Sequence, residues 1–181
     1  MGEQLDNKVL KARIRGGEVI SDLNPLSKSL LTKGFGERSG DAVRYMDVEA
    51  LYLVEEGRMR VVGEDGGSLS FNDLLTILAT HSPNLWRDYV VYRDLRKRRY
   101  VVKEGFGEEL RFRVFERGEY GEKAAKYVVV PVYEGRDTTV GKIRKWTQTC
   151  RNMRKELILA VVDRRNEVIY YRASLVDLRN V

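Results

Sequence analysis

The stretch Lys126–Gly135, KYVVVPVYEG, decides the fold class of the second half of this chain. Its apolar run from Val128 to Val132 is nearly continuous, which is typical of a strand buried on both faces of a sheet. Pro131 has no backbone N–H, so the far half of this strand is expected to lie at a sheet edge. The stretch therefore predicts the central strand of a mixed sheet with helices packed against it.

The segments around this strand complete the prediction for the second half. Before it, the sequence predicts a helix from residue 85, a strand over 100–103 and a strand over 110–118 with Leu110, Phe112 and Val114 on one face. After it come a long helix within 138–156 and a hairpin across DRRN. The inner stripe of the long helix is predicted to hold Val140, Ile143, Trp146, Cys150 and Met153.

The first half has the pattern of a smaller α+β domain. A hairpin is expected around Gly16-Gly17, and a helix follows Asn24 and Pro25. An amphipathic helix capped by Asp47 is predicted over 47–57, and a further helix is capped by Ser70 or Asn72. The predicted fold class is α/β (α+β), with an N-terminal α+β domain at 1–84 and a C-terminal mixed-sheet domain at 85–181.

The charge of the chain favours a polyanionic partner. The net charge is +6, the isoelectric point is near 9.4, and 33% of the residues are charged. Dense ion pairing at the surface is the competing interpretation. Three basic clusters, Arg93–Arg99, Arg111–Arg117 and Lys142–Lys155, are interleaved with aromatic residues. Because aromatic rings stack on bases and cations contact phosphates, this pattern favours RNA.

The single cysteine and single histidine exclude several kinds of site. Cys150 alone cannot form an intrachain disulfide or a cysteine zinc site, and His81 alone cannot form a histidine-pair metal site. His81 is interpreted as a helix-end cation facing the last carbonyls. We expect no metal and no cofactor. The sequence has no signal peptide and no apolar run of about 18 residues, which predicts a cytoplasmic protein without a membrane segment.

Several spaced blocks of the chain resemble one known family. The blocks VVYRDLRKRRYVVKEGFG, FRVFERG, KYVVVPV and MRKELILAVVDRRNEVIYYRAS follow in order the C-terminal domain of archaeal tRNA-splicing endonucleases, and VEALYLVEEGRMRV is similar to their N-terminal domain. The resemblance implies RNA cleavage without a metal. In that family, a Tyr deprotonates the ribose 2′-hydroxyl, a His protonates the leaving oxygen and a Lys stabilises the charged phosphorane.

Carried over to this sequence, two of those three groups are absent. The Tyr of the motif falls on Phe115, the His falls on Ala124 (or on Ala125 after a slip of one residue), and the Lys falls on Lys155. An Arg that stacks on a bulged base in the family falls near Gln148. The resemblance therefore implies a non-catalytic structural subunit that binds precursor tRNA and pairs with a catalytic subunit, as an α2β2 heterotetramer.

The resemblance also implies where RNA and the partner would bind. The predicted RNA-binding residues are Arg111, Arg113, Arg117, Lys155 and Arg172. The last strand of the family adds to the partner's sheet edge, and the turn of its final hairpin is acidic. Here Arg164 and Arg165 dilute the acidic turn. The predicted partner contacts are Asp163, Glu167, Val168, Ile169 and Tyr170.

Two other functions stay open at the level of sequence. A self-sufficient ribonuclease would use Lys155 with Tyr120 or Tyr127 as a relocated base. Tyr127 lies on the apolar strand, so Tyr120 in the loop is the better candidate. A stand-alone RNA-binding module would bind RNA as a monomer, with strong salt dependence.

Overall fold

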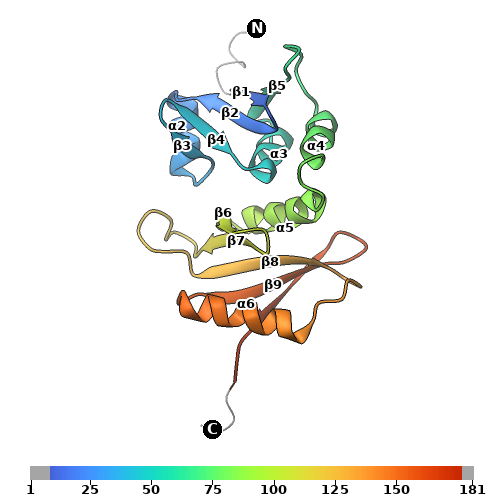
Figure 1. Cartoon of the computed structure of the whole chain (residues 1–181). Helices are drawn as coiled ribbons and strands as arrows, with labels where there is room; N and C mark the ends of the chain where they lie inside the picture. Colours follow the sequence, from blue (N-terminus) through green and yellow to red (C-terminus); the bar gives the residue numbers. More distant parts are fainter. Residues whose placement is uncertain (1–8, 177–181) are drawn as a thin grey trace. The chain divides into compact units, whose positions relative to one another are not determined.

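The computed structural model describes residues 9–176. The chain divides into two compact units, with the boundary between Tyr89 and Val90. Each unit contains its own five-stranded sheet and helices, as Figure 1 shows. The predicted α+β class is therefore confirmed.

Unit 1 is built on a sheet with the strand order β3-β4-β2-β1-β5. Its strands are β1 (Leu10–Arg15), β2 (Glu18–Asp22), β3 (Glu37–Ser39), β4 (Ala42–Tyr45) and β5 (Met59–Val62). The predicted hairpin at Gly16-Gly17 is confirmed, and both glycines have positive φ, which other residues rarely adopt. β1 and β5 are parallel, and the other pairs are antiparallel.

The helices of unit 1 are α2 (Pro25–Thr32), α3 (Asp47–Glu55) and α4 (Phe71–Ala79). Asn24 and Ser70 cap α2 and α4. Asp47 was predicted as the cap of α3, and this prediction is wrong. Met46 occupies the N-cap, the Glu49 carboxylate accepts its N–H at 3.0 Å, and Asp47 instead accepts a hydrogen bond from the Ser82 hydroxyl.

The amphipathic pattern predicted for α3 is also wrong. The helix is buried at every position from Val48 to Leu53. It packs against β2 and β5 of the sheet and also against α4, so no side of its central turns meets water. A helix with such neighbours is mostly apolar on every side, and the buried Glu49 carboxylate accepts hydrogen bonds from the backbone N–H groups of Gly36 and Met46.

Unit 2 contains the sheet β10-β9-β8-β7-β6. Its strands are β6 (Val101–Phe106), β7 (Leu110–Phe115), β8 (Tyr127–Tyr133), β9 (Glu156–Val162) and β10 (Val168–Ala173). β8 is the central strand, as predicted, and it runs parallel to β9. Beyond Val129 it pairs only with β9, so the half containing Pro131 has one open side, as its missing N–H requires.

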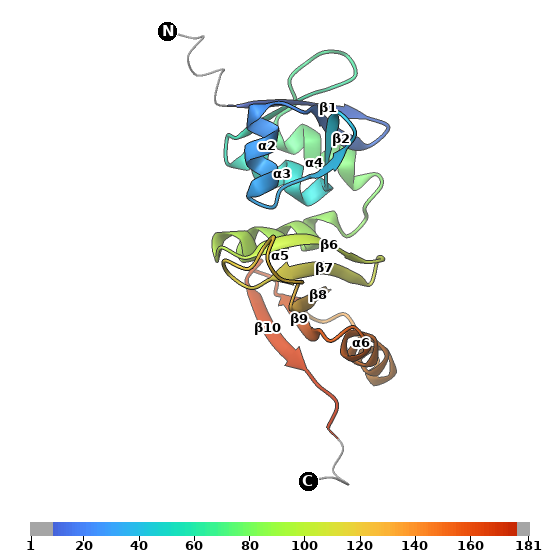
Figure 2. The same cartoon turned by 90° about the vertical axis from the view of Figure 1, so that its left-hand side faces the viewer.

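Two helices cover opposite faces of this sheet (Figures 1 and 2). On one face α5 (Leu85–Lys97) places the ring of Tyr92 against Phe112. On the other face α6 (Val140–Asn152) buries Trp146 and Cys150 against β8 and β9. Val140 was predicted in the inner stripe of α6, but it is 83% exposed because it is the first residue of the helix.

Candidate functional site

In the sheet of unit 2, the end of β7 and the starts of β8 and β9 lie at the same end of the sheet. Val114 pairs with Tyr127, and Tyr127 pairs with Glu156. The Lys126 N–H donates to the Val114 carbonyl, and the Glu156 N–H donates to the Lys126 carbonyl. The end of β7 and the starts of β8 and β9 therefore lie side by side. This register brings the carried-over positions Phe115, Ala124 and Lys155 to the same end of the sheet.

Lys155 points toward the loop that joins β7 and β8. Its ammonium group donates to the Ala125 carbonyl at 2.5 Å, and its side chain is half-buried. Arg154 has a φ of 55°, a left-handed conformation that turns the chain from α6 into β9. The one retained member of the carried-over group thus holds the loop before β8, and its assignment to a phosphate stays a prediction.

Phe115 and Ala124 bring no proton-transferring group to this edge. The half-exposed ring of Phe115 meets the ring of Tyr120 edge-on, with centroids 5.0 Å apart. Ala124 is exposed and Ala125 is buried, so only the first would leave room for a larger side chain. The strand frame is present without an acid or a base at these two positions.

A polar cluster beside Phe115 was not predicted from the sequence. The Glu116 carboxylate accepts hydrogen bonds from the Lys126 ammonium and the Tyr127 hydroxyl, both at 2.9 Å. The hydrogen bond to Lys126 lowers the pKa of Glu116, and that bond raises the pKa of Lys126. Burial raises the pKa of Tyr127, and its proton is donated to Glu116. Tyr127 is therefore poorly placed to act as a base.

The arginines predicted to bind RNA have partners within unit 2. Arg111 lies 3.9 Å from Glu104 and is 17% exposed, and Arg113 donates to the Glu104 carbonyl at 2.6 Å. Arg117 stacks over the ring of Tyr100, and Arg172 pairs with Glu156 at 3.3 Å. Their assignment to RNA stays a prediction.

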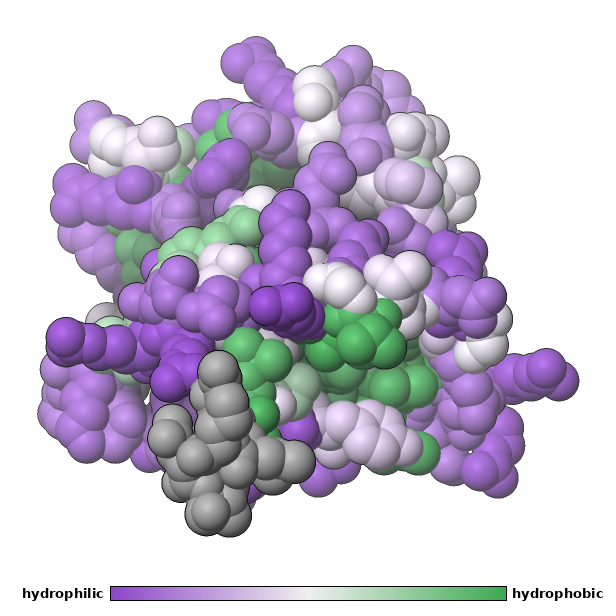
Figure 3. Space-filling model, turned by 60° about the horizontal axis from the view of Figure 1, so that its bottom comes forward, coloured by the Kyte–Doolittle hydropathy of each residue, from purple (hydrophilic) through white to green (hydrophobic). Residues whose placement is uncertain are grey.

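The strand β10 has one anchored face and one exposed face. The Tyr170 hydroxyl donates to Asp94 of α5 at 2.7 Å, and Arg98 pairs with the same carboxylate and stacks over the Tyr170 ring. On the opposite face Ile169 is 51% and Tyr171 53% exposed. Figure 3 shows a hydrophobic area on one face of the molecule, surrounded by hydrophilic residues.

In the turn between β9 and β10, the acidic residues form hydrogen bonds and ion pairs with other residues of the same turn. Asp163 accepts the N–H groups of Arg165 and Glu167 at 2.8 and 2.9 Å. The Arg165 guanidinium pairs with both carboxylates. These hydrogen bonds, the one from the Glu167 N–H foremost, lower the pKa of Asp163. The predicted partner contact of this turn stays a prediction, with its charge neutralised in part.

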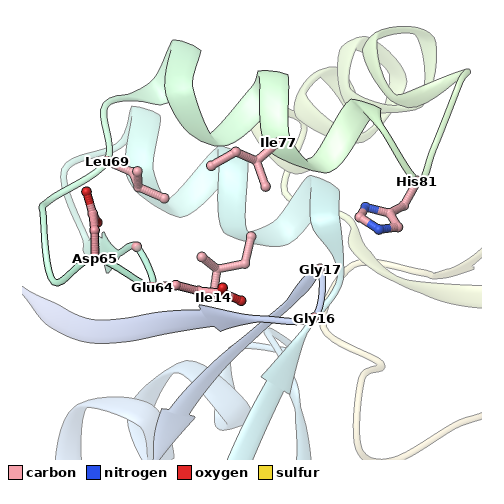
Figure 4. Close-up of a pocket in the computed structure, with 9 residues that line it drawn as sticks. Ile14, Gly16, Gly17, Glu64, Asp65, Leu69, Ile77 and His81 are labelled. Atoms are coloured by element: carbon pink, nitrogen blue, oxygen red, sulfur yellow. The ribbon is translucent and has the colours of Figure 1, made fainter.

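Figure 4 shows a pocket of about 580 Å³ in unit 1. Ile14, Leu69 and Ile77 form its apolar wall. His81 lies at one end against Gly17, where an added Cβ would come within 3.2 Å of the imidazole ring. The ring forms a hydrogen bond with the Thr80 hydroxyl, so the prediction that it faces the last helix carbonyls is wrong.

The described residues offer neither a metal site nor a membrane span. From residue 9 to residue 176, no group of three or more His, Cys, Asp or Glu side chains is arranged to hold a metal ion. None of the described helices has the length and apolar character that crossing a membrane requires.

Comparison with known proteins identifies a family for both halves of the chain. The family described as tRNA intron endonuclease, catalytic C-terminal domain, matches residues 85–170, and the N-terminal domain of tRNA intron endonuclease matches 10–75. The chain is 32% identical over 160 residues to a tRNA-splicing endonuclease of Methanococcus vannielii, covering 88% of this chain and 90% of that protein.

Two further relatives differ in length. A tRNA-splicing endonuclease of Methanopyrus kandleri is 34% identical over 82% of this chain and 80% of its own. One from Methanosarcina barkeri is 28% identical over 91% of this chain but only 46% of its own length. The similarity runs through both units and includes the three strand ends described above. The chain therefore belongs to the tRNA intron endonuclease family.

Proposed function

We propose that this chain is the structural subunit of a tRNA-splicing endonuclease, and that it supports a catalytic partner in excising introns from precursor tRNA. One observation carries the proposal: Phe115 and Ala124 occupy the positions that the resemblance gives to the base and the acid. The similarity to several tRNA-splicing endonucleases supports the reaction class. The substrate would be precursor tRNA at bulge–helix–bulge sites.

The chemistry of the reaction explains why these two residues matter. Attack of a 2′-hydroxyl on the adjacent phosphate needs a base, an acid for the leaving 5′-oxygen and a cation for the developing charge. A phenyl ring and a methyl group cannot accept or donate a proton. Each missing acid or base costs roughly 10²- to 10⁴-fold in rate. Lys155 alone would leave the chain inactive, without the 2′,3′-cyclic phosphate and 5′-hydroxyl products.

The sheet of unit 2 supports the proposed assembly with a partner. The sheet of unit 2 is complete, and β10 at its end has an apolar face that no described residue of unit 2 covers fully. A strand of this kind suits addition to the sheet edge of another subunit. In this proposal the partner supplies the Tyr, His and Lys, and the complex is a hetero-oligomer, with α2β2 the expected form.

We expect the purified chain to cleave no precursor tRNA, and the chain mixed with its partner to cleave at both splice sites. The partner is to be obtained by co-purification from the source organism. The measurement is gel analysis of labelled precursor tRNA with end-group determination. Strong cleavage by this chain alone, at the rate of the mixture, would contradict the proposal.

One contact favours a second function, a self-sufficient ribonuclease. The ring of Tyr120 lies against Phe115, so a hydroxyl is present close to the vacated position. If Tyr120 were the base, Tyr120→Phe would lower cleavage by the chain roughly 10²- to 10⁴-fold, while Tyr127→Phe would not. The structural-subunit proposal instead expects both variants to support cleavage by the partner as the wild type does. Single-turnover rates of each variant, measured with and without the partner, distinguish the two functions.

A further inference from the structure

The net charge of this chain is concentrated on one short segment. The chain contains 33 Lys and Arg residues and 27 Asp and Glu residues. Residues 138–155 hold six of these cations and no carboxylate, so the remainder of the chain carries 27 of each sign. The segment consists of α6 and the turn that leads into β9. Its charge of +6 therefore equals that of the whole protein.

The helix places most of these cations on its outer side. Ile143, Trp146 and Cys150 face the sheet. Arg144, Lys145 and Arg151 are exposed. Seven residues of α-helix span about 10 Å, so the three cations form a row along α6. Between them Gln148 donates to the Asn152 side chain at 2.9 Å, which adds polar amides to the row.

Three of the cations on α6 and in the turn after it are not neutralised by an ion pair. Among the described residues, Arg144, Arg151 and Arg154 form no ion pair. By contrast, Lys142 on the flank of the same helix pairs with Glu109 at 2.8 Å, and Trp146 donates to that carboxylate. The bond from Lys142 does most to lower the pKa of the Glu109 carboxyl, and Lys145 also lies close enough to help lower it. The interpretation of a mixed, ion-paired surface therefore fits the flank but not Arg144, Arg151 and Arg154.

The row leads directly to the positions of Phe115, Ala124 and Lys155, here called the vacated site. After α6 the chain turns at Arg154, and the next residue is Lys155, whose ammonium lies on the Ala125 carbonyl. We propose that Arg144, Lys145, Arg151 and Arg154, here called the α6 track, bind the phosphate backbone of the RNA substrate and hold it across the vacated site. This inference rests on the proposed function, because that function supplies the RNA.

An RNA backbone suits the α6 track better than an acidic protein segment. Protein interfaces are anchored by buried aromatic and apolar side chains, and the outer row of α6 has none. Phosphates are contacted by Arg, Lys, Asn and Gln side chains, which are the residues present. The track carries no base-specific arrangement, so it would add affinity without sequence preference.

The test compares two triple variants of the full chain that lose the same charge. The first is Arg144→Gln, Lys145→Gln and Arg151→Gln, and the control is Lys11→Gln, Arg15→Gln and Lys28→Gln at exposed positions of unit 1. The probe is a precursor tRNA with 2′-deoxy nucleotides at the cleavage positions, so that no cleavage occurs. Binding is measured by fluorescence anisotropy over a salt series, and circular dichroism melting checks the fold.

We expect the track variant to bind at least about tenfold more weakly near 0.1 M salt. The slope of log K against log salt should fall by about 2, since each lost contact to single strands removes about 0.7. The control should keep the slope of the wild type. Equal salt slopes for the two triple variants would overturn the proposal. A track variant that binds RNA like the wild type but no longer associates with the partner would overturn it as well. Cleavage by the chain alone would refute the proposed function but leave this slope difference intact.

Discussion

Phe115→Tyr combined with Ala124→His is expected to give this chain a ribonuclease activity that the wild type lacks. The first substitution adds one hydroxyl to a half-exposed ring at the end of β7. The second adds an imidazole at an exposed position of the loop before β8. Lys155 already lies at the same edge, so base, acid and cation would then surround one phosphate.

The expected gain is large because the acid and the base act together. Each contributes roughly 10²- to 10⁴-fold, so either single variant should stay at least about 100-fold slower than the double variant. Adding Lys155→Ala to the double variant should remove the activity again. The assay is single-turnover cleavage of a bulge–helix–bulge RNA in EDTA, with end-group analysis. The rate of the double variant should depend on pH with a bell-shaped profile. Any partner in the assay carries a disabled active site.

Ala125→His is the matched control for the position of the imidazole. Ala125 is 5% exposed, so a histidine there would have to displace packed atoms of the loop. We expect Phe115→Tyr with Ala125→His to show no activity and a lower melting temperature. A folded Phe115→Tyr and Ala124→His protein that binds the RNA without cleaving it would contradict the vacated-site interpretation.

The sequence predicts the elements of this fold well where burial is one-sided or complete. The alternation of Leu110, Phe112 and Val114 and the apolar run of β8 both predict strands, because side-chain burial follows the backbone period. The β3–β4 hairpin was missed, since its short first strand is exposed throughout and carries no apolar pattern. Val140 fits the helical period but is the first residue of α6 and is exposed there.

In the candidate site, some features can be predicted from single residues of a motif, and others depend on how the strands pair. The absent groups at Phe115 and Ala124 are properties of the residues themselves, so a motif comparison detects them. The cluster of Glu116, Lys126 and Tyr127 joins residues about ten apart across a strand pair, and only the register of β7 with β8 brings them together. No spacing rule in the sequence predicts such a contact.

Ile169→Asp is expected to weaken association with the proposed catalytic partner strongly while leaving the chain folded. β10 is the last strand of its sheet order, so its outer edge pairs with no other strand among residues 9–176. Exposed strand edges of this kind pair readily with another chain. The bond from Tyr170 to Asp94 fixes one face of β10 to α5, and this leaves Ile169 and Tyr171 presented on the other.

The physical reason is the cost of burying a carboxylate in an apolar interface. A buried charge without a partner is strongly unfavourable, whereas the same residue in water costs little. We expect the dissociation constant to rise at least about 100-fold, which corresponds to about 2.7 kcal/mol. Tyr171→Asp should act in the same direction. Analytical ultracentrifugation of the mixed subunits measures the loss, and precursor tRNA cleavage should fall in parallel.

Val140→Asp is the matched control, because Val140 is an exposed apolar residue at 83% accessibility but lies on α6 rather than β10. An acidic residue in the first turn of a helix is favourable, so this variant should fold and associate like the wild type. Both variants should melt within a few degrees of the wild type, since neither side chain is in the core. An Ile169→Asp chain that sediments with its partner as the Val140→Asp chain does would show that β10 is not the assembly strand.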